Sequence, residues 1–281
     1  MRQRTLTSVA ILSVSLLVVI FSKYIVYPIA LAILSIVGVF EILRVIKRHK
    51  FVSLAIPAYI LAGAFPVSAY FVTADNGMTF ILCLAAVMFV FMLYLMGVSI
   101  FSKGKIPFSA ISEVFVSVAY VTISFTSLSL LRYFDYRVGV FEVVLVFVVA
   151  WICDVFAFVI GSKFGKHKLI PEISPKKTVE GAIGGVVFTL IFCLIYGVGL
   201  DYIVEGITVN YLFLAIIGVV LAVVSQLGDL VASLIKREYG IKDYGCVFPG
   251  HGGIMDRFDS IISISSILLM LCIVFPPFNF I

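Results

Sequence analysis

Residues 139–161 read GVFEVVLVFVVAWICDVFAFVIG, and this stretch decides the fold class. A helix needs about 20 mostly apolar residues to cross the hydrocarbon core of a bilayer, and this stretch is long enough. Its apolar residues follow one another without the two-residue alternation that marks the strands of membrane β-barrels. Because a segment in lipid must satisfy its own backbone hydrogen bonds, we predict a membrane-spanning α-helix.

Stretches of this kind recur along the whole chain. Of its 281 residues, 63% are hydrophobic and 12% are charged, whereas an ordinary soluble domain carries about 25% charged residues. No soluble core could bury so much apolar surface, so we predict an all-α, polytopic integral membrane protein with about nine transmembrane helices. The first span is short, and eight spans remain an alternative. The spans are expected near residues 6–22, 25–46, 51–71, 78–100, 110–131, 139–161, 181–200, 210–234 and 259–278.

No Pro-, Gly- or Ser-rich linker divides the chain, so residues 1–281 are interpreted as a single membrane domain. Residues 1–150 are expected to supply membrane spans without motifs, and residues 151–281 form the half that carries the motifs. The apolar start lacks a small-residue cleavage site, which favours a membrane span over a signal peptide. The five cysteines have no paired or metal-ligand spacing and are interpreted as structural, reduced thiols.

The loop charges predict the orientation. If the N-terminus is cytoplasmic, 17 of the 20 Lys and Arg residues lie on the cytoplasmic side, and only Lys23, Arg132 and Arg137 lie on the other. Cytoplasmic loops are enriched in Lys and Arg. We therefore expect a multi-pass protein of the cell (inner) membrane, with its N-terminus inside and its C-terminus outside. The polar loops 162–180 and 235–258 would then meet water-soluble anions in the cytoplasm.

Two features precede the strongest motif. Asp154 lies deep in a predicted span, where an ionised group is costly unless it is paired or hydrated, so it is a candidate site residue. The alternative is a carboxylate that only packs helices together through a hydrogen bond. In the following loop, Ser174, Lys176 and Lys177 precede a predicted helix start that Thr178 would cap and Pro175 would suit. Lysines beside a helix N-terminus favour phosphate binding, although a basic cytoplasmic loop explains them as well.

Residues 225–260 read SQLGDLVASLIKREYGIKDYGCVFPGHGGIMDRFDS and hold the densest cluster of acidic, basic and glycine residues. Ser225, Asp229, Ser233 and Lys236 have a spacing that places them on one helical face. Asp229, the deepest charged residue of this polar stripe, needs a cationic partner. Farther along, the glycines around His251 predict a turn whose N–H groups could cradle an anion.

Two carboxylates from different elements, Asp229 and Asp256, could hold Mg²⁺, which takes few protein ligands and completes its shell with water and substrate phosphates. Basic residues would neutralise those phosphates, namely Lys236, Arg237, Lys242 and Arg257. Simpler alternatives exist for single residues. The glycines could form a plain reverse turn, His251 a hydrogen-bonded turn residue, and Asp259 a helix cap. In the N-terminal half, Glu41 and Arg44 are interpreted as a local ion pair on one helix face.

At these residues the sequence closely resembles the phosphatidate cytidylyltransferase family, also called CDP-diacylglycerol synthases. The SPKKT stretch at 174–178 also resembles this family, and the resemblance in motifs covers about residues 151–260. The family signature matches at Ser233, Lys236, Arg237, Lys242, Asp243, Gly245, Phe248, Pro249, His251, Gly252, Gly253, Asp256, Arg257 and Asp259.

The resemblance implies transfer of the cytidylyl group of CTP to phosphatidate, which yields CDP-diacylglycerol and pyrophosphate. It also implies Mg²⁺ at Asp229 and Asp256, a second monovalent cation such as K⁺, and a homodimer. We expect Asp229, Lys236, Asp256 and Arg257 to be catalytic, and Asp154, Asp243 and Asp259 to be possible further site residues. The expected substrate-binding residues are Ser174, Lys176, Lys177, Ser233, Arg237, Lys242, His251, Gly252 and Gly253.

Two other functions remain open from the residues alone. A membrane kinase that uses CTP to phosphorylate a lipid alcohol would have similar basic loops, but it would release CDP without pyrophosphate. A secondary transporter would also carry intramembrane carboxylates, yet it would place them near the bilayer midplane within interrupted helices. The polar residues here gather at one predicted membrane edge, which favours chemistry on a lipid headgroup. No nucleic acid partner is expected.

Overall fold

The structure, a computed structural model, describes residues 20–103, 105–248 and 252–280. Within this part of the chain, eight helices are long and apolar enough to cross a membrane. They confirm the predicted class, a helical polytopic membrane protein, and correspond to the second to ninth predicted spans. The predicted first span at 6–22 lies almost entirely outside the described residues. The eight helices are α2 (Val26–Val45), α3 (Val52–Ser68), α4 (Gly77–Phe101), α5 (Phe108–Tyr133), α6 (Gly139–Phe164), α7 (Val179–Ile203), α8 (Tyr211–Glu238) and α9 (Met255–Val274).

The shorter elements lie at the ends of these helices. Two single-turn 3₁₀ helices, η1 (Phe21–Lys23) and η2 (Ala69–Phe71), precede α2 and follow α3. Strands β1 (Lys168–Ile170) and β2 (Ser174–Thr178) form an antiparallel hairpin between α6 and α7. Strand β3 (Ile207–Val209) precedes α8 and pairs with β4 (Phe278–Phe280) near the C-terminus. The backbone groups of these four strands are thus paired in two short ladders.

The chain divides into two compact units, and the division does not follow the order of the sequence. Unit 1 comprises residues 1–136 and 241–257, and unit 2 comprises residues 137–240 and 258–281. The segment 241–257, which we grouped with residues 151–281, therefore packs with the N-terminal helices.

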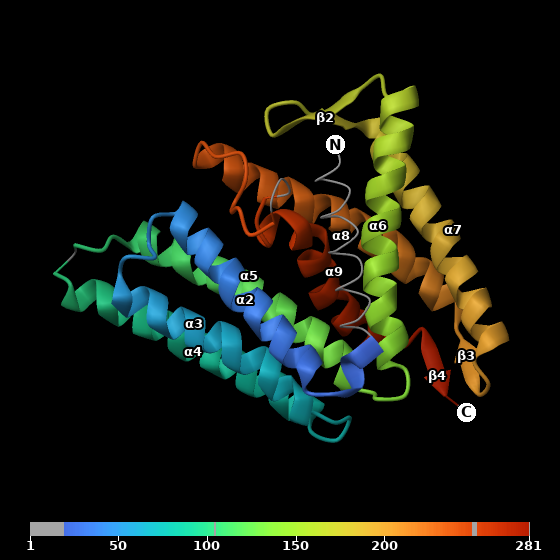
Figure 1. Cartoon of the computed structure of the whole chain (residues 1–281), viewed down its shortest axis with the longest axis horizontal. Coiled ribbons are helices and arrows are strands. Elements are labelled where there is room, and N and C mark those ends of the chain that lie inside the picture. The colour runs from blue at the N-terminus through green and yellow to red at the C-terminus, as the bar shows by residue number, and fades with distance from the viewer. Residues whose placement is uncertain (1–19, 104, 249–251, 281) are drawn as a thin grey trace. The chain divides into compact units, whose positions relative to one another are not determined.

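In unit 1, α2 and α5 pack along each other, and α3 contacts both (Figure 1). Small residues on one face of α3, Ala55, Ala58 and Ala62, are almost completely buried and let the helices approach closely. Buried hydroxyls join the helices, since Tyr27 donates to the carbonyl of Leu128 at 3.1 Å and Ser129 to that of Pro66 at 2.9 Å. By contrast, only 22% of the apolar window of α4 is buried, so most of its side chains are left to contact lipid.

In unit 2, α6 and α7 form the closest helix pair, with the β1–β2 hairpin at one end of α7 and β3 at the other (Figure 1). Glycines permit this approach, because a Cβ at Gly181 would lie 2.6 Å from the carbonyl oxygen of Ala157. Helix α8 packs against both α6 and α7. The sequence predicted a loop at residues 162–180, but the structure forms a β-hairpin there. As a result, the basic residues there lie on two paired strands.

Candidate active site

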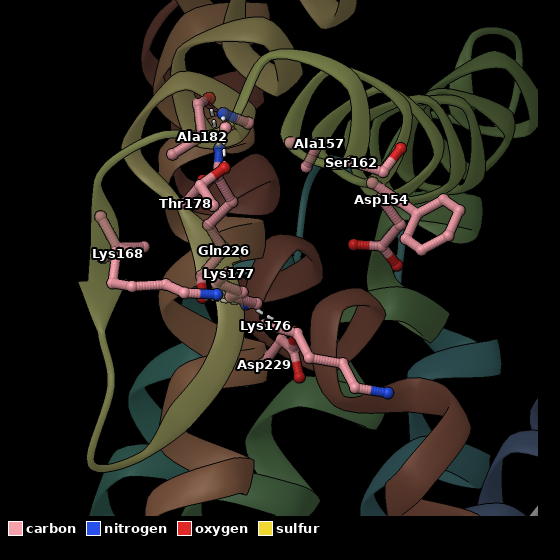
Figure 2. A pocket seen from close by; sticks show the side chains of 15 residues that line it. Asp154, Ala157, Ser162, Lys168, Lys176, Lys177, Thr178, Ala182, Gln226 and Asp229 are labelled. Carbon is pink, nitrogen blue, oxygen red and sulfur yellow. Dashed lines mark hydrogen bonds and ion pairs between the residues drawn. The ribbon is translucent and has the colours of Figure 1, made fainter.

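Unit 2 contains a cavity of about 500 Å³ between the β1–β2 hairpin and helices α6, α7 and α8. Figure 2 shows the side chains that line it, including Asp154 from α6, Lys168, Lys176 and Lys177 from the hairpin, and Asp229 from α8. The two carboxylates and three lysines come from residues up to 75 positions apart. The fold thus gathers the motifs at SPKKT and in the polar stripe of α8 around one cavity.

The centre of this cavity is an ion pair between Lys177 and Asp229, whose Nζ and Oδ2 atoms are 2.5 Å apart. The two side chains are 25% and 31% exposed, so the pair is shielded but still reachable from solvent. Lys177 also donates to the carbonyl of Gln226 at 3.5 Å. The expectation that Asp229 has a cationic partner is confirmed, and the partner is supplied by the SPKKT stretch.

Further acidic groups surround Asp229. Asp154 interacts electrostatically with both Asp229 and Lys177, and Asp259 interacts with Asp229, Asp154 and Lys236. Three carboxylates in one region repel one another, so the region attracts cations. Helix α9 begins at Met255, which places Asp259 inside the helix, and the alternative that it caps the helix start is wrong.

Local hydrogen bonds hold the hairpin lysines in place. Thr178 caps α7 as predicted, because its side chain accepts a hydrogen bond from the backbone N–H of Gly181 at 3.2 Å. Glu180 accepts bonds from the backbone N–H groups of Lys166 and His167 and lies 2.6 Å from Nδ1 of the His167 ring. Lys168 donates across the hairpin to the carbonyl of Pro175 at 2.7 Å. Pro175 lies in β2, so the suggestion that it starts the helix is wrong.

The predicted residues on α8 share one helix, as their spacing indicated. Ser225, Asp229, Ser233, Lys236 and Arg237 all lie within Tyr211–Glu238. Arg237 donates from Nε to the carbonyl of Ile173 at 3.3 Å, between the two strands of the hairpin. Ser174, at the start of β2, is half-buried. This contact of Arg237 therefore joins the C-terminal end of α8 to the hairpin that carries the lysines.

The other predicted residues belong to segment 241–257 of unit 1, which contains Lys242, Asp243, Asp256 and Arg257. Asp256 accepts two backbone hydrogen bonds at Oδ2, from Tyr244 at 2.7 Å and from Gly253 at 2.9 Å. Residues 249–251 of the predicted turn lie outside the described residues, and on either side of them Phe248 donates to the carbonyl of Gly252 at 2.9 Å. Gly252 has a φ of +85°, which explains why a glycine stands there. His251 lies outside the described residues.

Asp229 and Asp256 lie in different units, so their predicted pairing at one metal ion stays a prediction. Among the described residues, no three His, Cys, Asp or Glu side chains form a ready metal cage. Mg²⁺ does not require one, because it commonly binds one or two carboxylates together with water and phosphate oxygens. The oxygen donors gathered around Asp229 fit this chemistry.

The sequence did not single out Lys168 and Gln226, which are among the polar residues that line the cavity. Lys168 was one of several lysines in a loop, and only the hairpin register directs it to the cavity. Gln226 donates from Nε2 to the carbonyls of Ala182 at 3.2 Å and Ala222 at 3.3 Å, which joins α8 to α7. Its position beside Ser225, at the start of the polar stripe, was the available signal.

Comparison with known proteins gives a consistent result. A family model described as "Cytidylyltransferase family" matches residues 2–275. A phosphatidate cytidylyltransferase of Bacillus subtilis (strain 168) is 35% identical over 278 residues, which cover 98% of each chain. A phosphatidate cytidylyltransferase of Staphylococcus saprophyticus is 39% identical over 64% of this chain and 65% of its own length. One of Staphylococcus aureus (strain COL) is also 39% identical, over 62% of this chain and 64% of its own length.

Proposed function

This chain belongs to the cytidylyltransferase family, and on that premise we propose that it transfers the cytidylyl group of CTP to phosphatidate. The products are CDP-diacylglycerol and pyrophosphate, and the reaction belongs to phospholipid biosynthesis. The observation that carries the proposal is the ion pair of Lys177 and Asp229 in a lysine-lined cavity. The names of the relatives favour this reaction over a lipid-alcohol kinase or a transporter.

The shape of unit 2 supports a substrate that is part anion and part lipid. A groove of about 440 Å³ adjoins the polar cavity, and both are lined by Leu169, Ala182 and Gln226. The rest of the groove is formed by aliphatic side chains of β1, α7 and α8, namely Ile170, Ile183, Val186, Val187, Val223, Leu227 and Leu230. A phosphate headgroup among the lysines would thus have room for an acyl chain beside it.

The reaction needs no nucleophile from the protein. A phosphate oxygen of phosphatidate attacks the α-phosphorus of CTP, a new P–O bond forms, and the bond from the α-phosphorus to the leaving pyrophosphate breaks. The protein must bring two polyanions together and stabilise the charge on the transferring group. Lys176 and Lys177 supply positive charge at the cavity. When substrate phosphates enter, Lys177 exchanges Asp229 for a phosphate oxygen, which leaves Asp229 to hold a cation.

The metal chemistry is part of the proposal. Asp229 and Asp256 would hold Mg²⁺, with the negative charge of Asp154 and Asp259 raising the affinity for cations. When bound, Mg²⁺ supplies positive charge that offsets the charge of the phosphates. By resemblance to the family, we also propose a second monovalent cation such as K⁺ and a homodimer. The site would face the cytoplasm, where CTP is available.

The test is a reaction of the purified protein with CTP, phosphatidate and Mg²⁺. We expect equal amounts of CDP-lipid and pyrophosphate, measured by thin-layer chromatography and by a coupled pyrophosphate assay. A parallel reaction with diacylglycerol in place of phosphatidate tests the kinase alternative, which predicts lipid phosphate and CDP without pyrophosphate. If folded protein forms neither CDP-lipid nor pyrophosphate, the proposed function is wrong.

A further inference from the structure

A buried carboxylate in the N-terminal half makes contacts that the sequence did not reveal. Glu41 lies near the end of α2 and is 1% exposed. We interpreted Glu41 and Arg44 as a local ion pair on one helix face. The two groups do interact electrostatically, and both side chains also reach segment 241–257 of unit 1, which carries Asp256 and Arg257. The two residues therefore have a partner that is about 200 positions away in the chain.

Glu41 binds the start of α9. Its Oε1 accepts a hydrogen bond from the backbone N–H of Ile254 at 3.1 Å, and its Oε2 accepts one from Met255 at 2.9 Å. The first N–H groups of a helix lack partners within the helix, and the positive end of the helix dipole favours a carboxylate there. Neither Ile254 nor Met255 has a side-chain oxygen that could serve as a cap. Glu41 supplies that oxygen from another helix.

Two glycines of segment 241–257 make room for this carboxylate. A Cβ added at Gly245 or at Gly253 would overlap Oε1 of Glu41. Both glycines belong to the signature that the sequence shares with the family, whereas Glu41 lies far outside it. Their lack of a side chain is thus explained by the space that Glu41 occupies. Gly38, one turn earlier on α2, similarly faces the Met255 side chain, because a Cβ there would lie 3.3 Å from its sulfur.

The same contacts lead directly to Asp256. Arg44 donates to the carbonyl of Tyr244 at 2.6 Å, and the N–H of Tyr244 donates to Oδ2 of Asp256 at 2.7 Å. The N–H of Gly253 also donates to this oxygen at 2.9 Å, and the N–H of the next residue, Ile254, donates to Glu41. Each of the two amides that bind Asp256 therefore belongs to, or adjoins, a residue that is bound by a side chain of α2.

We infer that Glu41 is a positioning residue for cytidylyl transfer, assisted by Arg44, and that it holds segment 241–257 so that Asp256 and Arg257 are correctly placed. This inference rests on the proposed function for its catalytic consequence. Glu41 itself does not contact the reacting atoms in this scheme, since both of its oxygens accept backbone N–H groups. The N-terminal half, which carries no signature motif, thereby takes part in the function.

The primary test compares Glu41→Gln with Glu113→Gln in the full-length protein. Glutamine keeps one acceptor oxygen but sets an NH₂ donor against a backbone N–H. Glu113 is a suitable control, because its ion pair with Arg48 at 3.2 Å also lies in unit 1 but does not involve segment 241–257. For Glu41→Gln we expect kcat to fall about 10- to 100-fold, as a small displacement of reacting groups does, while the KM for CTP and for phosphatidate stays within about twofold.

A second readout does not depend on activity. We expect hydrogen exchange of the amides in residues 244–257 to become faster in Glu41→Gln and to stay unchanged in Glu113→Gln. Normal exchange and a kcat within about twofold of the wild type in folded Glu41→Gln would overturn the inference. If Glu41→Gln shows the expected faster exchange but the wild type forms no CDP-lipid, the proposed function is wrong while the contacts of Glu41 stand.

A third variant covers the case in which Glu41→Gln does not fold. Gly253→Ala leaves the carboxylate in place and adds a methyl group against it, so the same loss of kcat is expected. In Glu41→Ala the carboxylate is absent, and adding Gly253→Ala should then cost much less than it does alone, because residues in contact are not additive. Losses that simply multiply in the double variant would contradict the proposed contact.

Discussion

At the residue scale, the proposed chemistry depends on charged side chains, which are rare within membrane spans. An ionised side chain within a span is costly unless it is paired, and the structure shows Asp229 paired with Lys177 at 2.5 Å. Asp256 is held differently, by two backbone N–H groups of its own segment. An anion that competes for Lys177 could therefore release Asp229, whereas the backbone holds Asp256 in place.

The two carboxylates are expected to be essential for turnover. Asp229→Asn and Asp256→Asn remove a negative charge that would bind Mg²⁺, and we expect each to lower kcat at least about 100-fold, the size of effect typical for electrostatic groups of an active site. CDP-lipid formation measures the loss. Asp201→Asn is the control, because Asp201 lies at the other end of α7 and contacts Tyr211. A variant that inserts, purifies and works at a near-normal rate would remove its residue from the metal site.

Lys177 is expected to act through its charge. Lys177→Ala should lower kcat/KM for phosphatidate about 10- to 100-fold, since a charge-assisted contact to a phosphate is lost. Lys177→Arg should retain part of the activity because it keeps the charge. Lys163→Ala provides the comparison, since Lys163 is an exposed lysine in the last turn of α6 and does not line the cavity. Equal kinetics for Lys177→Ala and the wild type would show that the ion pair is only structural.

At the element scale, the position of the cavity depends on how closely α6 and α7 pack. A glycine on α7 sits against the backbone of α6, and the cap at Thr178 sets where α7 begins. The hairpin therefore emerges at a defined point and directs Lys168, Lys176 and Lys177 into the same space. The spacing of the motifs alone does not predict this arrangement, since the pairing of β1 with β2 depends on the strands meeting.

Two glycines of α7 allow a matched test of this packing. Gly181→Ala adds a Cβ 2.6 Å from the carbonyl oxygen of Ala157, whereas Gly199→Ala adds one with no atom within 4 Å. We expect Gly181→Ala to destabilise the protein by about 1–3 kcal/mol, the usual cost of overpacking, and to reduce activity. Gly199→Ala should be neutral or slightly stabilising. Thermal unfolding in detergent measures both, and equal stability of the two variants would contradict the close contact.

At the scale of the whole molecule, the protein is a multi-pass membrane protein of eight described helices that could span a bilayer. The two compact units do not follow the order of the sequence, because segment 241–257 returns to the N-terminal helices. This return lets a motif-free half support a motif-bearing segment. It also means that truncation of residues 1–136 would remove Glu41 and Arg44, which contact the segment that carries Asp256.

The predicted orientation can be tested by labelling single cysteines in intact cells. In a cysteine-free background, Asp75→Cys lies in the exposed loop between α3 and α4, and Lys103→Cys follows α4. The distribution of Lys and Arg predicts that a membrane-impermeant maleimide labels Asp75→Cys from outside and labels Lys103→Cys only after lysis. The reverse pattern would invert the predicted topology, and with it the cytoplasmic placement of the active site.

The sequence by itself determined the membrane location, the helical class and the family. These properties follow from local features, since hydropathy acts over about 20 residues and the signature spans a single stretch of chain. Asp229 and the SPKKT lysines were also recognisable as chemically active from residue type and spacing. The hairpin and the glycine-limited contact of α6 with α7 were not recognisable from the sequence.

Only the tertiary structure decided which of these groups meet. The partner of Asp229 is 52 residues away, and Glu41 caps a helix start 213 residues away. Such contacts depend on how side-chain volumes let helices pack, and no local pattern encodes that outcome. The apolar stretch at 139–161 illustrates both levels. Its composition makes it a membrane helix, but only packing directs Asp154 into a cavity shared with Lys177 and Asp229.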